Sequence, residues 1–205
     1  MRTIDIGLEK IDKIYHIADV HVRNVKRHKE YRIVFKRLYS YIKKTKTDNS
    51  IIYVAGDIVH AKTDMSPELI AVVSDFFKKL SDLAPTLIIT GNHDCNLNNS
   101  YRMDALRALN HQRLHYLKDN GIYYISGVHF NVLSVFDKPV DYIKADSFDG
   151  DYKIALHHGS VHNASTDAGF TLSNTHVTTN MFEGHDLVLL GDIHKPQYLN
   201  DEKTI

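Results

Sequence analysis

The sequence predicts an α/β fold with a βαβ N-terminal half, in which a sheet or pair of sheets is flanked by helices. Apolar runs alternate with helical segments over the first 90 residues, which is typical of βαβ units and a largely parallel sheet. Several apolar runs also end in polar clusters, namely Asp19-Val20-His21, Gly56-Asp57, Gly91-Asn92-His93-Asp94, His157-His158 and Gly191-Asp192-Ile193-His194. Ligands of open α/β sheets bind outside the carboxyl ends of the strands, so we expect these clusters to converge on one edge.

The strands and helices of the N-terminal half are the easiest to predict from the sequence. Short apolar runs predict strands at 13–18, 50–55 and 85–90. Apolar residues at helical spacing among lysines and arginines predict a first helix at about 27–46. Ser66 followed by Pro67 predicts the start of a second helix, because serine caps helices and proline suits their first turn.

The second half of the sequence is predicted to contain more strands than helices. The spacing of Met103, Leu106, Leu109 and Leu114 predicts a helix. The runs 121–126 and 128–136 predict two strands joined as a hairpin at Ser126-Gly127. Two more short strands are expected at 152–156 and 187–190, each leading into a polar cluster.

Composition is that of an ordinary globular chain. We expect one domain over 1–205, because 205 residues suffice for one sizeable core. No apolar run approaches the roughly 20 residues of a membrane helix, so we expect no membrane partner. The single cysteine, Cys95, fits a reducing intracellular compartment, and we expect a cytoplasmic protein. Fourteen histidines favour a metal site, because histidine is the commonest metal ligand.

The polar clusters supply ligands for two divalent cations. Two cations about 3.5–4 Å apart need a bridging carboxylate, and Asp57 suits that role since its two oxygens offer several lone-pair sites. Asp19 and His21 are one residue apart, so at a strand end both should point to one face and bind one cation. Asn92 offers a neutral amide oxygen. We therefore expect a two-metal phosphoesterase.

The ordered set Asp19-x-His21, Gly56-Asp57, Gly91-Asn92-His93-Asp94, a later His and Gly191-x-x-His194 resembles the calcineurin-like metallophosphoesterases from residue 13 to about 198. The resemblance implies a metallophosphoesterase-type β-sandwich flanked by helices. It also implies that one metal is held by Asp19, His21, Asp57 and His194, and the other by Asp57, Asn92, a histidine of the His157-His158 pair and Asp192. Manganese is the expected metal, with magnesium as the alternative.

The same resemblance assigns catalytic roles and leaves two points open. His93 would protonate the leaving group or stabilise the phosphate, with Asp94 orienting its ring. The family usually has Gly-His-x-His where this chain has Asp192, and an aspartate suits manganese or magnesium better than an imidazole does. The pattern does not decide between His157 and His158.

Further residues favour a nuclease. Gly-Asp-x-x-His, ending at His60 and followed by Ser66-Pro67, is similar to the SbcD-type nucleases, including phage and large-virus members, in which this histidine assists DNA cleavage. The alternative for His60 is a surface histidine in a polar loop. Basic residues beyond the first motif, among them Arg23, Arg27 and His28, are either a DNA-backbone contact or a solvated helix start.

We therefore expect a metal-dependent DNA exo- or endonuclease of recombination and repair. The resemblance implies DNA, an SMC-type ATPase resembling SbcC and, as a further option, a second copy of the chain as partners, in the host cytoplasm if the protein is viral. It also implies that the C-terminal cap and ATPase-binding segments of that group are absent or truncated. The alternatives are a small-molecule phosphodiesterase or phosphatase, and a non-catalytic scaffold.

Overall fold

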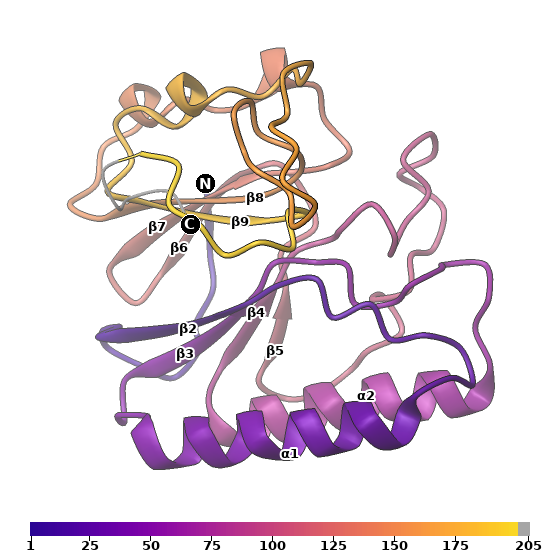
Figure 1. The fold of residues 1–205 in the computed structure, drawn as a ribbon. Coiled ribbons are helices and arrows are strands. Elements are labelled where there is room, and N and C mark those ends of the chain that lie inside the picture. The colour runs from indigo at the N-terminus through magenta and orange to yellow at the C-terminus, as the bar shows by residue number, and fades with distance from the viewer. Residues whose placement is uncertain (201–205) are drawn as a thin grey trace.

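The computed structural model describes residues 1–200 and contains two β-sheets packed face to face, with helices on one side (Figure 1). The four-stranded sheet has the order β2-β3-β4-β5 and is entirely parallel. Its strands are β2 (Lys13–Ile17), β3 (Ser50–Val54), β4 (Thr86–Ile88) and β5 (Leu114–Tyr116). The expected α/β fold with a parallel N-terminal half is confirmed.

The five-stranded sheet has the order β1-β6-β7-β8-β9. Its strands are β1 (Arg2–Thr3), β6 (Gly121–Ile125), β7 (Val128–Leu133), β8 (Lys153–His158) and β9 (Leu187–Gly191). The β6–β7 hairpin is antiparallel and turns at Ser126 and Gly127, as the sequence predicts. The pairs β7–β8 and β8–β9 are parallel, so β8 and β9 deliver their carboxyl ends to one edge.

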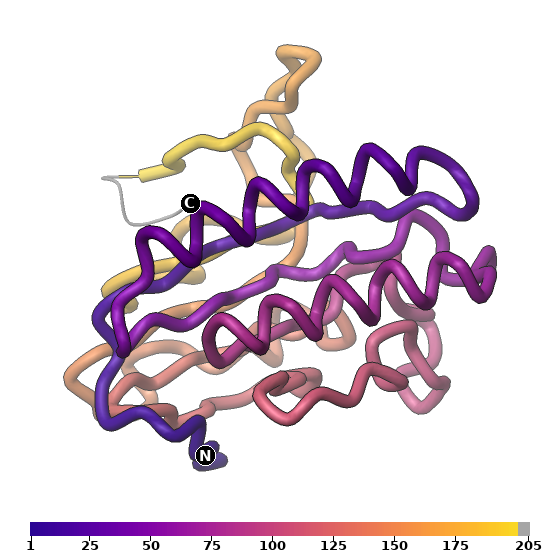
Figure 2. The backbone as a smooth tube through the Cα atoms, turned by 90° about the horizontal axis from the view of Figure 1, so that it is seen from below, coloured from indigo at the N-terminus to yellow at the C-terminus, as the bar shows by residue number. Residues whose placement is uncertain are grey.

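Two long helices cover the outer face of the four-stranded sheet. These are α1 (His28–Thr45) and α2 (Pro67–Leu83), which lie side by side in the view from below (Figure 2). Phe35 of α1 and Phe76 of α2 meet with ring centroids 4.3 Å apart. The hydroxyl of Ser66 accepts a hydrogen bond from the N–H of Leu69 at 3.3 Å, so the expected cap of α2 is present.

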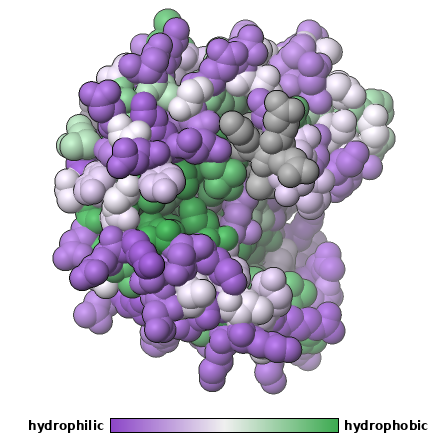
Figure 3. All heavy atoms as spheres, turned by 90° about the vertical axis from the view of Figure 1, so that its left-hand side faces the viewer, coloured by the Kyte–Doolittle hydropathy of each residue, from purple (hydrophilic) through white to green (hydrophobic). Residues whose placement is uncertain are grey.

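The core lies in three layers. The first packs both helices on β3 and β4 through residues such as Ile52 and Val54. The second fills the space between the sheets and includes Tyr53 and Phe130. The third lies outside β8 and β9 beneath short 3-10 turns at Pro139–Asp141, Ala145–Ser147 and Thr179–Phe182. Apolar atoms also gather in a hollow on the side face shown in Figure 3.

One expected helix is wrong. The segment through Met103, Leu106 and Leu109 forms turns, and Leu114 begins β5. The carboxylate of Asp104 accepts hydrogen bonds from the N–H groups of Leu106 and Arg107 and from the ammonium of Lys118. The bonds from Leu106 and Arg107 cap a single turn. The bonds of Asp104 with Lys118 and of the N–H of Ala105 with the carbonyl oxygen of Asp94 tie the segment to distant parts of the chain.

Within the described residues 1–200, no helix combines the length and apolar character needed to cross a membrane.

Candidate metal centre

The loops after β2, β3, β4, β8 and β9 meet at one edge of the two sheets, as the strand-end clusters predict. Two groups of side chains bring their ligand atoms within 4.8 Å of one another, namely Asp19, His21 and His194, and Asp19, Asp57 and His158. Both groups contain the donor types that divalent cations use in proteins. The donor set therefore fits a centre with two adjacent cation positions.

Asp57 belongs to the second group and also approaches His21 of the first. Its side chain is 2% exposed, with Oδ2 lying 3.4 Å from Nε2 of His21 and Oδ1 lying 3.4 Å from Nε2 of His158. The N–H of His93 donates to Oδ1 at 2.8 Å, which fixes the carboxylate. Burial opposes its ionisation, but the hydrogen bond and charge of His158 outweigh that effect and lower the pKa of Asp57. The geometry suits the bridging role expected for this residue.

His158 is oriented by the backbone. Its Nδ1 lies 2.6 Å from the carbonyl oxygen of Ala55, so Nδ1–H donates there and Nε2 faces the site. Nε2 lies 2.9 Å from Oδ1 of Asn92. Burial acts to lower the pKa of His158, but its hydrogen bond with Asp57 and the nearby negative charge raise it to about 9. A buried carboxylate cluster that attracts a proton in this way is also suited to a cation.

His157 does not reach the centre. Successive side chains of β8 point to opposite faces, so His157 enters the layer outside the sheet, where its ring packs near Tyr142 and Phe182. Its Nδ1 lies 2.8 Å from the carbonyl oxygen of Leu133. The structure therefore places His158, and not His157, among the candidate ligands.

Asp19 and His21 reach the centre through turns of the backbone, and not because side chains alternate along a strand. β2 ends at Ile17, and Asp19 and His21 both have left-handed backbones, with φ of 54° and 47°. The explanation from the pleat of a strand is therefore wrong, although both side chains do reach the site. Nε2 of His21 lies 3.1 Å from Nε2 of His194, and burial lowers the pKa of His21 to about 4. Two imidazole nitrogens that face each other at this distance suit a shared cation.

His93 and His60 lie beside this group. The ring centroid of His93 is 4.8 Å from that of His21 and 6.0 Å from that of His60. Nδ1 of His93 lies 2.6 Å from the carbonyl oxygen of His60, so Nδ1–H donates there and Nε2 is left for a ligand. His21, His60 and His93 also bring ligand nitrogens within 4.8 Å of one another.

Asp94 has a different role from the expected one. Its carboxylate is buried and accepts hydrogen bonds from the N–H groups of Ile58 (2.9 Å), Val59 (3.1 Å) and Gly91 (3.0 Å). It thus ties the loop after β3 to the loop after β4, while the backbone of His60 orients His93. Burial raises the pKa of Asp94 to about 6. The expectation that Asp94 orients the His93 ring is wrong.

Two glycines allow the loops to pack this closely. A Cβ on Gly91 would lie 2.1 Å from Oδ1 of Asp57, and a Cβ on Gly191 would lie 2.5 Å from the carbonyl oxygen of Ala55. Neither position can carry a side chain without moving a candidate ligand or the backbone that orients one. These glycines of the sequence motifs thus serve close packing around the centre.

The segment that carries Arg23, Arg27 and His28 lies beside the centre, and the side chains of Arg27 and His28 have partners within the protein. The hydroxyl of Tyr31, in the first turns of α1, donates to the carbonyl oxygen of His21 at 2.7 Å and so attaches the loop to the site. Arg23 and Arg27 are exposed, with Arg27 paired to Glu30 at 2.6 Å. A ring nitrogen of His28 lies 2.8 Å from the carbonyl oxygen of Arg23 and so helps to close the loop.

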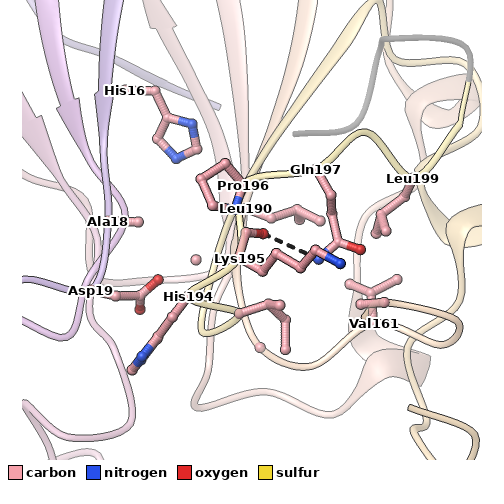
Figure 4. A pocket seen from close by; sticks show the side chains of 14 residues that line it. His16, Ala18, Asp19, Val161, Leu190, His194, Lys195, Pro196, Gln197 and Leu199 are labelled. Atoms are coloured by element: carbon pink, nitrogen blue, oxygen red, sulfur yellow. Dashed lines mark hydrogen bonds between the residues drawn. The ribbon is translucent and has the colours of Figure 1, made fainter. Parts of the chain in front are cut away.

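A cavity of about 480 Å³ adjoins the centre (Figure 4). Asp19 and His194 lie at one end of it, and Leu190 and Pro196 form part of its apolar lining. The amide of Gln197 donates to the carbonyl oxygen of Lys195 at 3.1 Å and helps to hold the segment after β9.

Two polar side chains near the centre were not singled out by the sequence. The ammonium of Lys62 donates to the carbonyl oxygen of Asn92 at 2.9 Å. The hydroxyl of Ser160 donates to Oδ2 of Asp192 at 2.5 Å. Each follows a predicted site histidine by two residues, His60 and His158, and that proximity is the one feature by which the sequence could have indicated them.

Comparison with known proteins agrees with the geometry. The family described as calcineurin-like phosphoesterase matches residues 12–196. An uncharacterized protein of Acanthamoeba polyphaga mimivirus is 44% identical over 217 residues, an alignment that includes 98% of this chain. The chain spans 16% of the length of that viral protein. The likeness is consistent with the expected resemblance to a large-virus member.

Proposed function

Because the chain belongs to the calcineurin-like phosphoesterase family, we propose that it is a manganese-dependent nuclease that hydrolyses phosphodiester bonds of DNA. Family membership supports metal-dependent phosphoester hydrolysis in general. The observation that carries the narrower proposal is the placement of His60 against His93, beside the candidate ligands. The exposed Arg23 and Arg27 beside the centre support a polyanionic substrate.

The candidate ligands give each cation position a distinct set of donors. Asp19, His21 and His194 would hold one cation, His158, Asn92 and Asp192 would hold the other, and Asp57 would contact both. When bound, two divalent cations supply Lewis-acid activation of a water and neutralise charge on the phosphoryl group.

The protein's own residues supply orientation and proton transfer. Asp57 is fixed by the N–H of His93, so the loop that carries the candidate acid also positions the candidate bridging carboxylate. With Nδ1–H donated to the backbone, Nε2 of His93 faces the site, where in the protonated ring it would donate to the departing oxygen. His60 holds that ring through its backbone oxygen and places its own imidazole on the same side. This arrangement supports assistance to the leaving group of a bulky phosphodiester.

The test is cleavage of DNA by the purified protein. We expect nicking of a single-stranded oligonucleotide or degradation of duplex ends in Mn²⁺, loss of both with a chelator, and recovery on adding Mn²⁺. His93→Ala should abolish cleavage of every substrate. His60→Ala should reduce DNA cleavage at least tenfold while bis(p-nitrophenyl) phosphate is still hydrolysed. His176→Ala is the matched control, since His176 is an exposed histidine outside the candidate site.

Hydrolysis of bis(p-nitrophenyl) phosphate or small nucleotides without cleavage of DNA would refute the nuclease proposal and leave a small-molecule phosphodiesterase. No hydrolysis of any phosphoester would favour a scaffold. We propose an SMC-type ATPase or a second copy of the chain as protein partners on the resemblance alone.

A further inference from the structure

Asp192 is held in a specific orientation at the end of β9. Its backbone is left-handed, with φ of 90°, and its N–H donates to Oδ1 of Asp19 at 2.9 Å. Its carboxylate Oδ1 lies 3.9 Å from Nε2 of His158. The turn after β9 therefore directs this carboxylate towards the His158 side of the centre.

The second carboxylate oxygen of Asp192 has a partner of its own. The hydroxyl of Ser160, two residues beyond His158, donates to Oδ2 at 2.5 Å. When one oxygen of a carboxylate accepts a hydrogen bond from a hydroxyl, the other oxygen is left as the atom that can bind a metal ion. Ser160 thus fixes which oxygen of Asp192 faces the centre, as a hydrogen bond to a ligand commonly does around protein-bound metals.

The two sides of the centre then differ in donor chemistry. On one side, two imidazoles, His21 and His194, accompany Asp19. On the other side, the carboxylate of Asp192 and the amide oxygen of Asn92 accompany His158. Oxygen donors suit Mn²⁺ and Mg²⁺, whereas imidazole suits Zn²⁺ and other later transition metals.

We propose that Ser160 and Asp192 make the His158 side an oxygen-rich cation position whose relative preference is moved from Zn²⁺ towards Mn²⁺ and Mg²⁺, with Ser160 as the positioning residue. The inference rests on the proposed two-metal function and concerns the selectivity of one of the two positions. It assigns a role to Ser160, a residue that neither the motifs nor the family resemblance identifies.

The test measures metal binding rather than activity. Mn²⁺ and Zn²⁺ are each titrated into the metal-free protein by calorimetry, and the unaltered protein should bind two Mn²⁺ ions. Ser160→Ala should weaken one of the two Mn²⁺ sites about tenfold and leave the other within about twofold, since loss of a partner to a ligand costs about 10–100-fold in metal affinity. Ser160→Thr, which keeps the hydroxyl, should restore the affinity.

Asp192→His tests the same position from the ligand itself. It should raise the ratio of Zn²⁺ affinity to Mn²⁺ affinity at one site at least tenfold, because an imidazole replaces a carboxylate oxygen. Ser165→Ala is the matched control, since the hydrogen bonds between Ser165 and Gln197 are made by the serine backbone. Circular dichroism checks that each variant is folded, and Asp192→His carries the test if Ser160→Ala does not fold.

The outcomes separate this inference from the proposed function. Two Mn²⁺ ions bound by the unaltered protein, with both affinities unchanged in Ser160→Ala, would overturn the role of Ser160 alone. Equal weakening of both sites would also overturn it, because a general loosening of the fold would then explain the result. An unchanged Zn²⁺ to Mn²⁺ ratio in Asp192→His would overturn the selectivity. Failure of the unaltered protein to bind Mn²⁺ would overturn both the inference and the two-metal function.

Discussion

Asp94 offers the sharpest test of how the centre is held together. If its carboxylate joins two loops, Asp94→Ala should destabilise the whole fold, because the N–H groups of Ile58, Val59 and Gly91 lose a buried acceptor. Leaving a buried donor without a partner costs about 1–3 kcal/mol, so three donors give about 3–9 kcal/mol. The free energy of unfolding of a typical domain is about 5–15 kcal/mol, so this variant should retain little net stability.

A second variant at the same position calibrates this magnitude. In Asp94→Asn the remaining oxygen can still accept from Ile58 and Val59, while the new amide group faces the N–H of Gly91. One bond is lost instead of three, and the expected cost falls to about 1–3 kcal/mol. Asp82→Ala is the matched control, since the exposed pair of Asp82 with Lys78 should contribute less than about 1 kcal/mol.

The assay is urea unfolding in metal-free buffer at pH 7.5, followed by far-ultraviolet circular dichroism because the chain has no tryptophan. Removing metal matters, because a bound cation would add its own stabilisation of the folded state. If the free energy of unfolding of Asp94→Ala lies within about 1 kcal/mol of that of the unaltered protein, the reasoning is refuted. Loss of phosphoesterase activity at unchanged stability would restore the role in orienting His93.

Three more predictions concern single side chains. Burial lowers the pKa of His16 to about 4 from 6.5, so the unfolded chain takes up a proton on acidification before the folded one does. The stability due to neutral His16 is therefore present above pH 6.5 and lost towards pH 4, and His16→Gln should reduce the difference between urea midpoints at pH 7.5 and 5. His158→Ala should weaken Mn²⁺ binding at least tenfold in calorimetry, whereas His157→Phe should change it less than twofold; equal effects would contradict the assignment. Gly91→Ala should abolish Mn²⁺ binding because its Cβ would meet Asp57, while Gly127→Ala, with φ of 85° and open space around it, should cost only about 1–2 kcal/mol of stability and leave binding intact.

The N-terminal half could be predicted from the sequence because residues close to one another in the chain determine its strands and helices. Strands β2, β3 and β4 are short apolar runs, and α1 and α2 show apolar residues at helical spacing between charged ones. Ser66 caps α2 with its own hydroxyl, three residues from the N–H it accepts. Such patterns need no knowledge of distant contacts.

The segment 103–113 could not be predicted because its structure depends on distant partners. Leucine spacing alone favours a helix, but Asp104 bonds to Lys118 and the N–H of Ala105 donates to the carbonyl oxygen of Asp94. These partners lie 14 and 11 positions away along the chain, so local propensity carries no trace of them.

The identity of the histidine ligand was undecidable for a different reason. β8 is buried on both faces, with Leu156 in the core between the sheets and Ala155 in the outer layer. An apolar run without alternation does not reveal which face is which. Only the packing of the second sheet shows that His158 shares the inner face with Leu156 and that His157 does not.

The backbone of the centre shows why its residues should act as a unit. Asp19, His21, Asp57 and Asp192 all have positive φ, a conformation that costs a non-glycine residue about 1–2 kcal/mol. No single loop could maintain this conformation alone, and each is held by another loop, since the N–H of His21 donates to the carbonyl oxygen of Asp57 and the N–H of Asp192 donates to the carboxylate of Asp19. Replacing Asp19 therefore removes the acceptor that holds the turn at Asp192, and its effect extends beyond the ligand removed. The separation of the strands in sequence does not weaken this coupling, because their carboxyl ends meet at one edge of the sandwich.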